Sequence, residues 1–201
     1  MTTTPVAPDA AVPGTRREQI LATAAELFAH RGFNGVSIND IGAAVGISGP
    51  ALYRHFPSKD AVLGEMLLGI SRSLLTEGSQ RRRAAASPSD LLPSLIEAHV
   101  EFALSQPALI TVYNRDIASL GEDDQREVRR LQRAYVEIWV GAIRDAVPGT
   151  DEQHARSAAH ATFGLINSTP HSARIDRAEM AELLTRMATA ALLTPGTLPR
   201  A

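Results

Sequence analysis

Apolar residues recur every three or four positions along most of this chain, the spacing that places them on one face of an α-helix. The first such stretch follows Thr15, a residue suited to cap a helix, and ends before Gly32. Its apolar positions are Ile20, Leu21, Ala24, Leu27 and Phe28. The pattern therefore predicts a first helix between Thr15 and Gly32.

A second helix is predicted to begin directly after Ser37. The Ser37 hydroxyl can accept a hydrogen bond from a free backbone amide, and Asp40 can reach back to the amide of Ser37. Gly46 then ends the helix in a position suited to a left-handed backbone. Because a further element starts at Ser48, the segment is predicted to be a helix, a tight turn and another helix.

The third element is unusually short. In the stretch "ISGPALYRHFPSK", residues 47–59, a Gly-Pro pair and a second proline bracket residues 51–56. This leaves room for less than two turns at about 3.6 residues per turn. Leu52 and Phe56 are spaced four apart and are expected to face inward, and Ser58 is expected to cap a longer helix.

Helical patterns continue to the end of the chain. The helix after Ser58 has apolar positions up to Leu74 and is expected to fade in the polar stretch 78–83. Further helices are predicted at residues 88–104, in a short stretch after Pro107, and at residues 122–147, 151–167 and 176–193. No window alternates apolar and polar residues between turn signals, so no strand is predicted.

The predicted fold class is therefore all-α, with an N-terminal three-helix domain and a C-terminal bundle of about six helices. Residues 1–14 contain three prolines and no periodic apolar pattern, so we predict a disordered arm there. The helix-turn-helix domain is assigned to residues 15–60. Residues 61–201 are assigned to a domain for ligand binding and dimerisation.

Composition narrows the possible chemistry. The chain has 201 residues, of which 44% are hydrophobic, and it has no cysteine. It can thus fill a core, but it has no thiol for a disulfide, a metal site or a nucleophile. No run reaches the ~18 apolar residues of a membrane span, and the N-terminus has no signal-peptide pattern. We therefore expect a cytoplasmic protein with no membrane partner.

The helix-turn-helix pattern is the geometry that lays one helix in the major groove of double-stranded DNA. Such a recognition helix contacts bases mainly through its N-terminal residues, which explains why so short a helix suffices. Tyr53, His55, Ser58 and Lys59 supply phosphate-binding groups beside it. The free amides of the helix after Pro57 add a partial positive charge. The alternative is that Tyr53 and His55 simply pack at a helix end.

Residues 15–67, "TRREQILATAAELFAHRGFNGVSINDIGAAVGISGPALYRHFPSKDAVLGEML", resemble the DNA-binding domain of the TetR family of bacterial transcriptional regulators. The "LYRHFPSKDAV" element after a "GIS" turn is highly specific. The resemblance implies a homodimer whose two recognition helices read successive major grooves of an operator. It also implies a C-terminal domain with a ligand pocket and the dimer interface. By position it implies phosphate contacts from Ser37, Tyr53, His55 and Lys59, and base contacts from Ser48, Gly49, Pro50 and Ala51.

The base-facing positions have little hydrogen-bonding capacity in this chain. Gly49 has no side chain, and Pro50 and Ala51 have apolar ones, so none can make a bidentate hydrogen bond to a base. Apolar contact with thymine methyl groups remains open to them. We expect sequence discrimination to come from Ser48 and Arg54, with Arg16 or Arg17 contributing from the arm.

The C-terminal part has few aromatic or amide side chains that could line a cavity for an effector. A small-molecule site is mostly apolar with a few fixed polar groups, so we expect a small, largely apolar effector. The candidates are His99, Phe102, Tyr113, Asn114, Tyr135, Trp139, Phe163, Asn167 and His171, each of which could instead belong to the core. No cofactor is predicted, and no metal site, since no two histidines here share the close helical spacing of paired ligands.

The last two long helices carry small and apolar residues that suit close packing against a second copy of the chain. The candidates for this dimer interface are Ala155, Ala158, Met180, Leu183, Leu184, Met187 and Ala191. The run from Arg81 to Arg83 is interpreted as a solvated linker.

Together these patterns predict a ligand-responsive transcriptional regulator, a repressor that binds a palindromic operator as a homodimer. Two alternatives stay open. In one, the larger domain only dimerises and binds no ligand, which a filled core would favour. In the other, the protein is a small helical enzyme with its site at residues 167–171, although the sequence contains no nucleophile elbow or Gly-rich phosphate loop.

Overall fold

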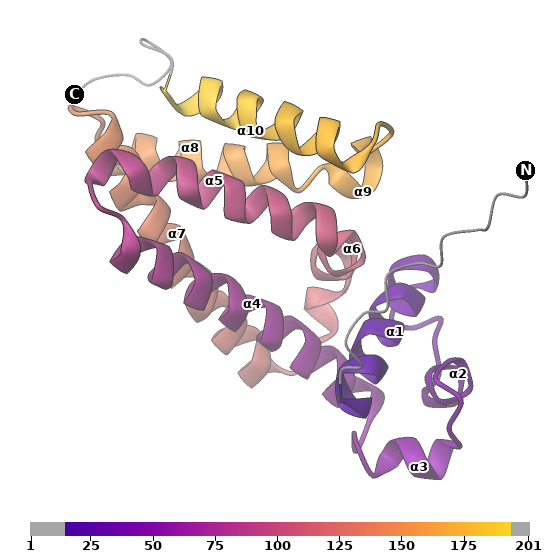
Figure 1. Cartoon of the computed structure of the whole chain (residues 1–201). Coiled ribbons are helices and arrows are strands. Elements are labelled where there is room, and N and C mark those ends of the chain that lie inside the picture. The colour runs from indigo at the N-terminus through magenta and orange to yellow at the C-terminus, as the bar shows by residue number, and fades with distance from the viewer. Residues whose placement is uncertain (1–14, 194–201) are drawn as a thin grey trace, which may run out of the picture.

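The computed structural model describes residues 15–193, and its first two helices begin at the capping residues that the sequence predicts (Figure 1). Helix α1 (Arg16–Arg31) begins at Thr15, which forms a capping box with Glu18, and it ends at Gly32. Helix α2 (Ile38–Ala44) begins with the capping box of Ser37 and Asp40. The predicted arm at residues 1–14 lies outside the described residues.

The turn between α2 and α3 (Gly49–Tyr53) is tight, as expected for a helix-turn-helix unit. Gly46 has a φ of +72°, the left-handed conformation that favours glycine. A Cβ on Gly42 would lie 3.0 Å from the carbonyl oxygen of Ile47, so the chain passes close to α2 at this point. Helix α3 includes Gly49 and Pro50, because a proline in the first turn sacrifices no helical hydrogen bond.

Helix α4 (Lys59–Ala84) is longer than its apolar pattern predicts. The polar stretch 78–83 remains helical because it is packed: a Cβ on Gly78 would lie 2.8 Å from the ring of Tyr135. Arg81 pairs with Glu77 at 2.7 Å and donates a hydrogen bond to Ser94 at 3.2 Å. The prediction that Arg81 to Arg83 form a solvated linker was therefore wrong, since these residues belong to the last turn of α4.

The remaining elements form a helical bundle around α4 and α7. Their bounds are α5 (Pro88–Ser105), α6 (Pro107–Asp116), the 3-10 turn η1 (Ile117–Ser119), α7 (Glu122–Ala146), α8 (Glu152–Ile166), α9 (Thr169–Ser172) and α10 (Arg177–Leu193). All nine predicted helices are present, and the described residues contain no strand. The sequence pattern missed α9 and η1, which are too short to show a period.

Two hydrophobic cores hold the molecule together, and α4 and α6 contribute to both. The bundle core is built around Trp139. The N-terminal core contains Phe28 of α1, but also Leu63 of α4, Val112 of α6 and Val128 of α7. Figure 1 shows α4 running from the N-terminal helices into the bundle, with α6 beside α1. Helices α4 and α6 thus connect the bundle core with the N-terminal core. No helix in residues 15–193 is long and apolar enough to cross a membrane.

Candidate DNA-binding surface and effector cavity

Helix α3 presents its first residues and its tyrosine to solvent at one end of the molecule (Figure 1). Ser48, Pro50 and Arg54 are exposed, and 52% of the surface of Tyr53 is accessible. Leu52 and Phe56 are fully buried, which confirms their predicted inward orientation. An exposed tyrosine contributes nothing to the core, so the geometry argues against the alternative that Tyr53 packs at a helix end.

The groups beside α3 are held in place by backbone hydrogen bonds. The Ser58 hydroxyl accepts a hydrogen bond from the amide of Ala61 at 3.0 Å and so caps α4. The Lys59 ammonium donates to the carbonyl oxygen of Phe33 at 2.7 Å and lies 4.2 Å from the centre of the Phe33 ring. An ammonium group has three N–H donors, so Lys59 can donate further hydrogen bonds to a phosphate. His55 is half-buried, whereas Ser37 is exposed.

Arg16 and Arg17 do not belong to an arm; they form the first turn of α1. Arg16 donates a hydrogen bond to the carbonyl oxygen of Val45 at 3.2 Å. The guanidinium of Arg17 binds the Glu65 carboxylate, donates to the carbonyl oxygen of His55 at 2.5 Å, and lies 4.2 Å from the centre of the Phe56 ring. Arg17 therefore ties the end of α3 to α4, and its placement in a flexible arm was wrong.

The half-buried Gly49 and Ala51 offer little to a base, but a polar neighbour lies beside them. A Cβ on Gly49 would lie 2.4 Å from the Oδ1 atom of Asn39, an exposed residue of α2. The glycine thus makes room for an amide next to the start of α3. Sequence reasoning overlooked Asn39, because only the close approach of α2 and α3 brings it to this surface.

A cavity of about 270 Å³ lies inside the bundle, between α4, α5, α6, α7 and α8. Seven of the nine predicted effector-binding residues line it: His99, Phe102, Tyr113, Asn114, Tyr135, Phe163 and Asn167. The structure thereby brings together seven residues from α5, α6, α7 and the end of α8, which the sequence could only name separately.

The two other predicted residues do not line the cavity. Trp139 is fully buried and packs behind it, with its ring 4.9 Å from that of Phe163. His171 is exposed on α9. Placing these two in the effector site was wrong, because Trp139 lies too deep in the core and α9 carries His171 to the outside.

His160, which was considered only as a metal ligand, does line the cavity. In the described part of the chain, no group of three or more acidic, histidine or cysteine side chains could hold a metal ion.

His99 is the buried polar centre of the cavity. Its Nδ1 atom lies 3.2 Å from the hydroxyl of Tyr135, and its ring is surrounded by those of Phe102, Trp139 and Phe163. Burial lowers the pKa of His99 to about 4, and the neighbouring Asn167 side chain only partly opposes this shift. The imidazole is therefore neutral at pH 7. Burial likewise raises the pKa of Tyr135 to about 12.

Two polar atoms of this cavity are buried without a hydrogen-bond partner among the described residues. They are the Nε2 atom of His99 and the Oδ1 atom of Asn167. A buried polar atom with no partner is costly, by about 1–3 kcal/mol. Within residues 15–193, none of the residues that line the cavity is a lysine, arginine, aspartate or glutamate. The cavity therefore offers neutral hydrogen-bonding groups in an otherwise apolar wall.

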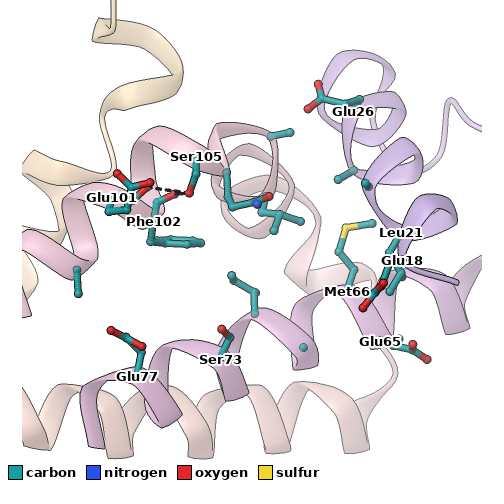
Figure 2. Close-up of a pocket in the computed structure, with 18 of the residues that line it drawn as sticks. Glu18, Leu21, Glu26, Glu65, Met66, Ser73, Glu77, Glu101, Phe102 and Ser105 are labelled. Carbon is teal, nitrogen blue, oxygen red and sulfur yellow. Dashed lines mark hydrogen bonds between the residues drawn. The ribbon is translucent and has the colours of Figure 1, made fainter. Parts of the chain in front are cut away.

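A wider groove of about 850 Å³ lies outside the cavity, between α1, α4, α5 and α6 (Figure 2). Ile70, Phe102 and Leu109 line both the groove and the cavity and so form the wall between them. The groove is acidic. Its glutamates, several of which Figure 2 labels, are Glu18, Glu26, Glu65, Glu77, Glu97 and Glu101. Among the described lining residues, Arg81 is the single cation, and it pairs with Glu77.

The predicted dimer residues fall into two groups. Ala155, Met180 and Leu184 are buried within the chain itself, so their assignment to an interface was wrong: they hold α8 and α10 against the bundle. Leu183 and Met187 are 43% and 44% exposed on the other side of α10. Ala191 is also exposed, and Ala158 is half-buried.

The helix-turn-helix geometry and the separate bundle agree with what sequence comparison finds. Residues 20–66 match the family model described as "Bacterial regulatory proteins, tetR family". Residues 85–192, more than half of the chain, match the model described as "Tetracyclin repressor-like, C-terminal domain". The chain belongs to the TetR family. It is therefore a DNA-binding transcriptional regulator and not an enzyme, which removes the catalytic interpretation of residues 167–171.

Characterised relatives of this TetR-family protein cover most of its length. The transcriptional repressor KstR2 of Mycolicibacterium smegmatis is 29% identical over 144 residues, which cover 71% of this chain and 70% of that protein. The transcriptional regulator CymR of Pseudomonas putida is 31% identical over 134 residues, which cover 62% and 64% of the two chains.

Solved structures share the fold over nearly the whole chain. A TetR-family regulator from Bordetella parapertussis superimposes with a TM-score of 0.79 at 25% identity, covering 93% of this chain and 99% of its own. AibR, solved in complex with isovaleryl coenzyme A and operator DNA, has a TM-score of 0.70 at 20% identity, covering 86% and 97%.

Proposed function

We propose that this protein is a repressor that binds a two-fold symmetric operator as a homodimer and leaves it when a small, largely apolar effector fills the bundle cavity. The observation that carries the proposal is the exposed helix α3 at one end of a molecule whose helical bundle contains a cavity. A regulator of this kind acts on DNA in the bacterial cytoplasm.

The DNA contacts follow from the exposed groups around α3. Ser37, Tyr53 and Lys59 face the DNA backbone, and His55 and Ser58 support them at the start of α4. Bases are read by Ser48, Arg54 and the amide of Asn39, while Pro50 and Ala51 make apolar contact with thymine methyl groups. This assignment of hydrogen bonds to neighbouring residues fits the sequence of α3, whose first residues have almost no hydrogen-bonding side chains.

The dimer forms through the exposed faces of α8 and α10. Leu183 and Met187 are large apolar side chains in solvent, and isolated chains rarely expose such residues together without a partner. On α8, Gly164 has nothing within 4 Å of where a Cβ would stand, which leaves room for a helix of the second copy. Two helices from each chain then form a four-helix interface with two-fold symmetry.

Effector binding reaches the DNA-binding helices through α4 and α6. Both helices line the cavity, through Ile70 of α4 and Tyr113 of α6, and both also pack into the N-terminal core. A ligand that spreads these helices changes the separation of the two recognition helices. Moving the population from almost fully DNA-competent to almost fully released requires ~5.5 kcal/mol of preference for the released form.

The alternative of a bundle that only dimerises is less well supported. It calls for a filled core, whereas the bundle contains a cavity of about 270 Å³ with unpartnered polar atoms. AibR, a structural neighbour, was solved in complex with isovaleryl coenzyme A and operator DNA. The present proposal likewise requires one protein to bind both a small molecule and an operator.

Selection of random DNA duplexes by the purified protein at two salt concentrations tests the proposal. An inverted repeat with half-sites about one helical turn apart is the expected outcome. Binding without sequence preference, with a steep dependence on salt, would contradict the regulator assignment of α3. The selected duplex then serves to measure release by candidate effectors.

A further inference from the structure

The wall of the bundle cavity contains two neutral polar side chains, each with an atom that no other residue in 15–193 satisfies. The imidazole of His99 is neutral, so one ring nitrogen donates a hydrogen bond and the other accepts one. Nδ1 is occupied by the Tyr135 hydroxyl at 3.2 Å, and the buried Nε2 atom has no hydrogen-bond partner among the described residues. The Asn167 side chain lies beside the imidazole and partly offsets the effect of burial on the pKa of His99, but its Oδ1 atom also has no partner in hydrogen-bond geometry among the described residues.

A hydroxyl group is the ligand chemistry that satisfies both atoms at once. It can donate a hydrogen bond to Asn167 and accept one from His99, and if the imidazole has the other tautomer, the hydroxyl can donate to Nε2 instead. A carbonyl group only accepts, so it leaves Asn167 unpaired. A carboxylate would lose its hydration in a cavity whose described lining has no lysine or arginine to offset the charge.

The groove outside the cavity selects against polyanions. Six glutamates line it. Among the described residues, Arg81 lies within the groove and pairs with Glu77, while Arg17 and Arg177 pair with Glu65 and Glu101. Figure 2 labels Glu18, Glu26, Glu65, Glu77 and Glu101 among the residues that line the groove. The phosphates of a coenzyme A thioester would be repelled there, because like charges at an exposed surface raise the free energy of binding.

We propose that the effector of this regulator is an uncharged, largely apolar molecule with a hydroxyl group that bridges His99 and Asn167, and not a coenzyme A thioester. This inference rests on the proposed effector role of the cavity and specifies its chemistry. It separates this protein from its structural neighbour AibR, which was solved with isovaleryl coenzyme A.

Four probes of graded chemistry test the proposal: 4-propylphenol, propylbenzene, 4-propylbenzoate and isovaleryl coenzyme A. Binding to the full chain is followed by the fluorescence of Trp139, the single tryptophan, whose ring packs against Phe163 of the cavity wall. The phenol is expected to bind at least about 10-fold more tightly than propylbenzene, because without the hydroxyl the two buried atoms stay unpaired. The carboxylate and the thioester are expected to bind more weakly than the phenol.

Variants identify the atoms responsible. Asn167→Ala is expected to reduce the preference for the phenol to less than about 3-fold, with propylbenzene binding retained as proof of an intact cavity. His99→Leu should have the same effect. Asn34→Ala is the matched control, since Asn34 is an exposed asparagine that does not line the cavity, and it should keep the full preference. In the Glu97→Gln, Glu101→Gln double variant, the thioester should bind several-fold more tightly at low salt, with the phenol unchanged.

Equal binding of the phenol and propylbenzene would overturn the inference, as would tighter binding of the thioester, or no binding of any probe. Its failure is distinguishable from failure of the proposed function. Release of the selected operator by isovaleryl coenzyme A would uphold the repressor and refute the hydroxyl ligand. Selective phenol binding by a protein that selects no operator would support the hydroxyl ligand and refute the repressor.

Discussion

Arg115 of α6 donates a hydrogen bond to the carbonyl oxygen of Ala29, in the last turn of α1, across 3.1 Å. The same guanidinium binds the carbonyl oxygen of Phe28 and is held by the carboxylate of Asp116 at 2.9 Å. Carbonyls at the end of a helix lack partners within it, and a positive charge there is favourable. Because α6 also lines the cavity, Arg115 connects a helix of the cavity wall to the end of α1.

Replacing Arg115 is expected to loosen this junction. Arg115→Met leaves the buried Asp116 without its partner and the end of α1 without its cap, so unfolding in urea should require about 1–3 kcal/mol less free energy. Arg126→Met is the matched control: Arg126 pairs with Glu122 and Asp123 on the exposed face of α7, and its loss should change stability by less than about 0.5 kcal/mol. Equal effects would refute the junction.

Lys59 and Arg17 are both basic and close to α3, yet they are expected to act differently on DNA. Lys59→Met should weaken binding to all duplexes and reduce the slope of log K against log salt by about 0.9 per half-site, because a phosphate contact is lost. Arg17→Met should weaken binding without changing that slope, since Arg17 holds the end of α3 through the carbonyl oxygen of His55. Fluorescence anisotropy with the selected operator over a range of salt concentrations measures both.

If the two slopes fall alike, Arg17 contacts phosphate itself, and its assigned positioning role is wrong. Circular dichroism of both variants controls for unfolding, because Lys59 also contacts Phe33.

The turn between α2 and α3 depends on the backbone of Gly46. A Cβ at this position would meet nothing within 4 Å, so any cost of Gly46→Ala comes from the φ of +72° alone. That cost is about 1–2 kcal/mol in unfolding free energy. Gly69→Ala offers a control of opposite sign: Gly69 is an exposed residue within α4, where alanine should stabilise the helix by up to about 1 kcal/mol. Thermal unfolding of the two variants should therefore shift in opposite directions.

Local rules predicted the N-terminal helices because their ends are specified by adjacent residues. Ser37 with Asp40 forms the predicted capping box, Thr15 caps the first helix as predicted, and Gly46 has the expected conformation. The same rules failed at residues 78–83. There the helix packs against the ring of Tyr135, which is distant in sequence. The pattern of neighbouring residues cannot predict such a contact.

The sequence predicted most of the residues considered for the cavity but not how they are arranged around it. A scarcity of aromatic and amide side chains in the C-terminal part pointed to seven residues that do line the cavity. It could not separate them from Trp139, because a buried ring behind a cavity and one at its wall have the same sequence signature. Likewise Met180 and Leu184 share an apolar stripe with Leu183 and Met187, and only the packing of α10 shows which pair faces inward.

The exposed face of α10 is expected to hold the dimer together. Leu183→Glu and Met187→Glu place charges in the proposed interface and should convert the dimer to a monomer, as measured by sedimentation or light scattering at a fixed protein concentration. Thr76→Glu is the control: Thr76 is exposed on α4, across the bundle from α10 (Figure 1), and its substitution should leave the dimer intact. A monomeric native protein, or dimers that tolerate both glutamates, would place the interface elsewhere.

His99 should make the stability of the protein depend on pH in a defined window. Its pKa is about 4 in the folded chain, against 6.5 as the ordinary value, because burial disfavours the charged ring. As the pH falls below about 6.5, the unfolded chain takes up a proton that the folded chain refuses, so stability is lost in that direction. The stabilisation is complete above the ordinary pKa and should decrease by about 2 kcal/mol by about pH 5.

Urea unfolding at about pH 7 and about pH 5, at one protein concentration, isolates this contribution when the native protein is compared with His99→Leu. The variant should lose about 2 kcal/mol less between the two pH values, because the carboxylates that also titrate are common to both proteins. His30→Gln removes an exposed histidine of α1 and should behave like the native protein. If His99→Leu shows the full pH dependence, the imidazole is protonated in the folded chain, and a neutral His99 facing the effector hydroxyl is ruled out.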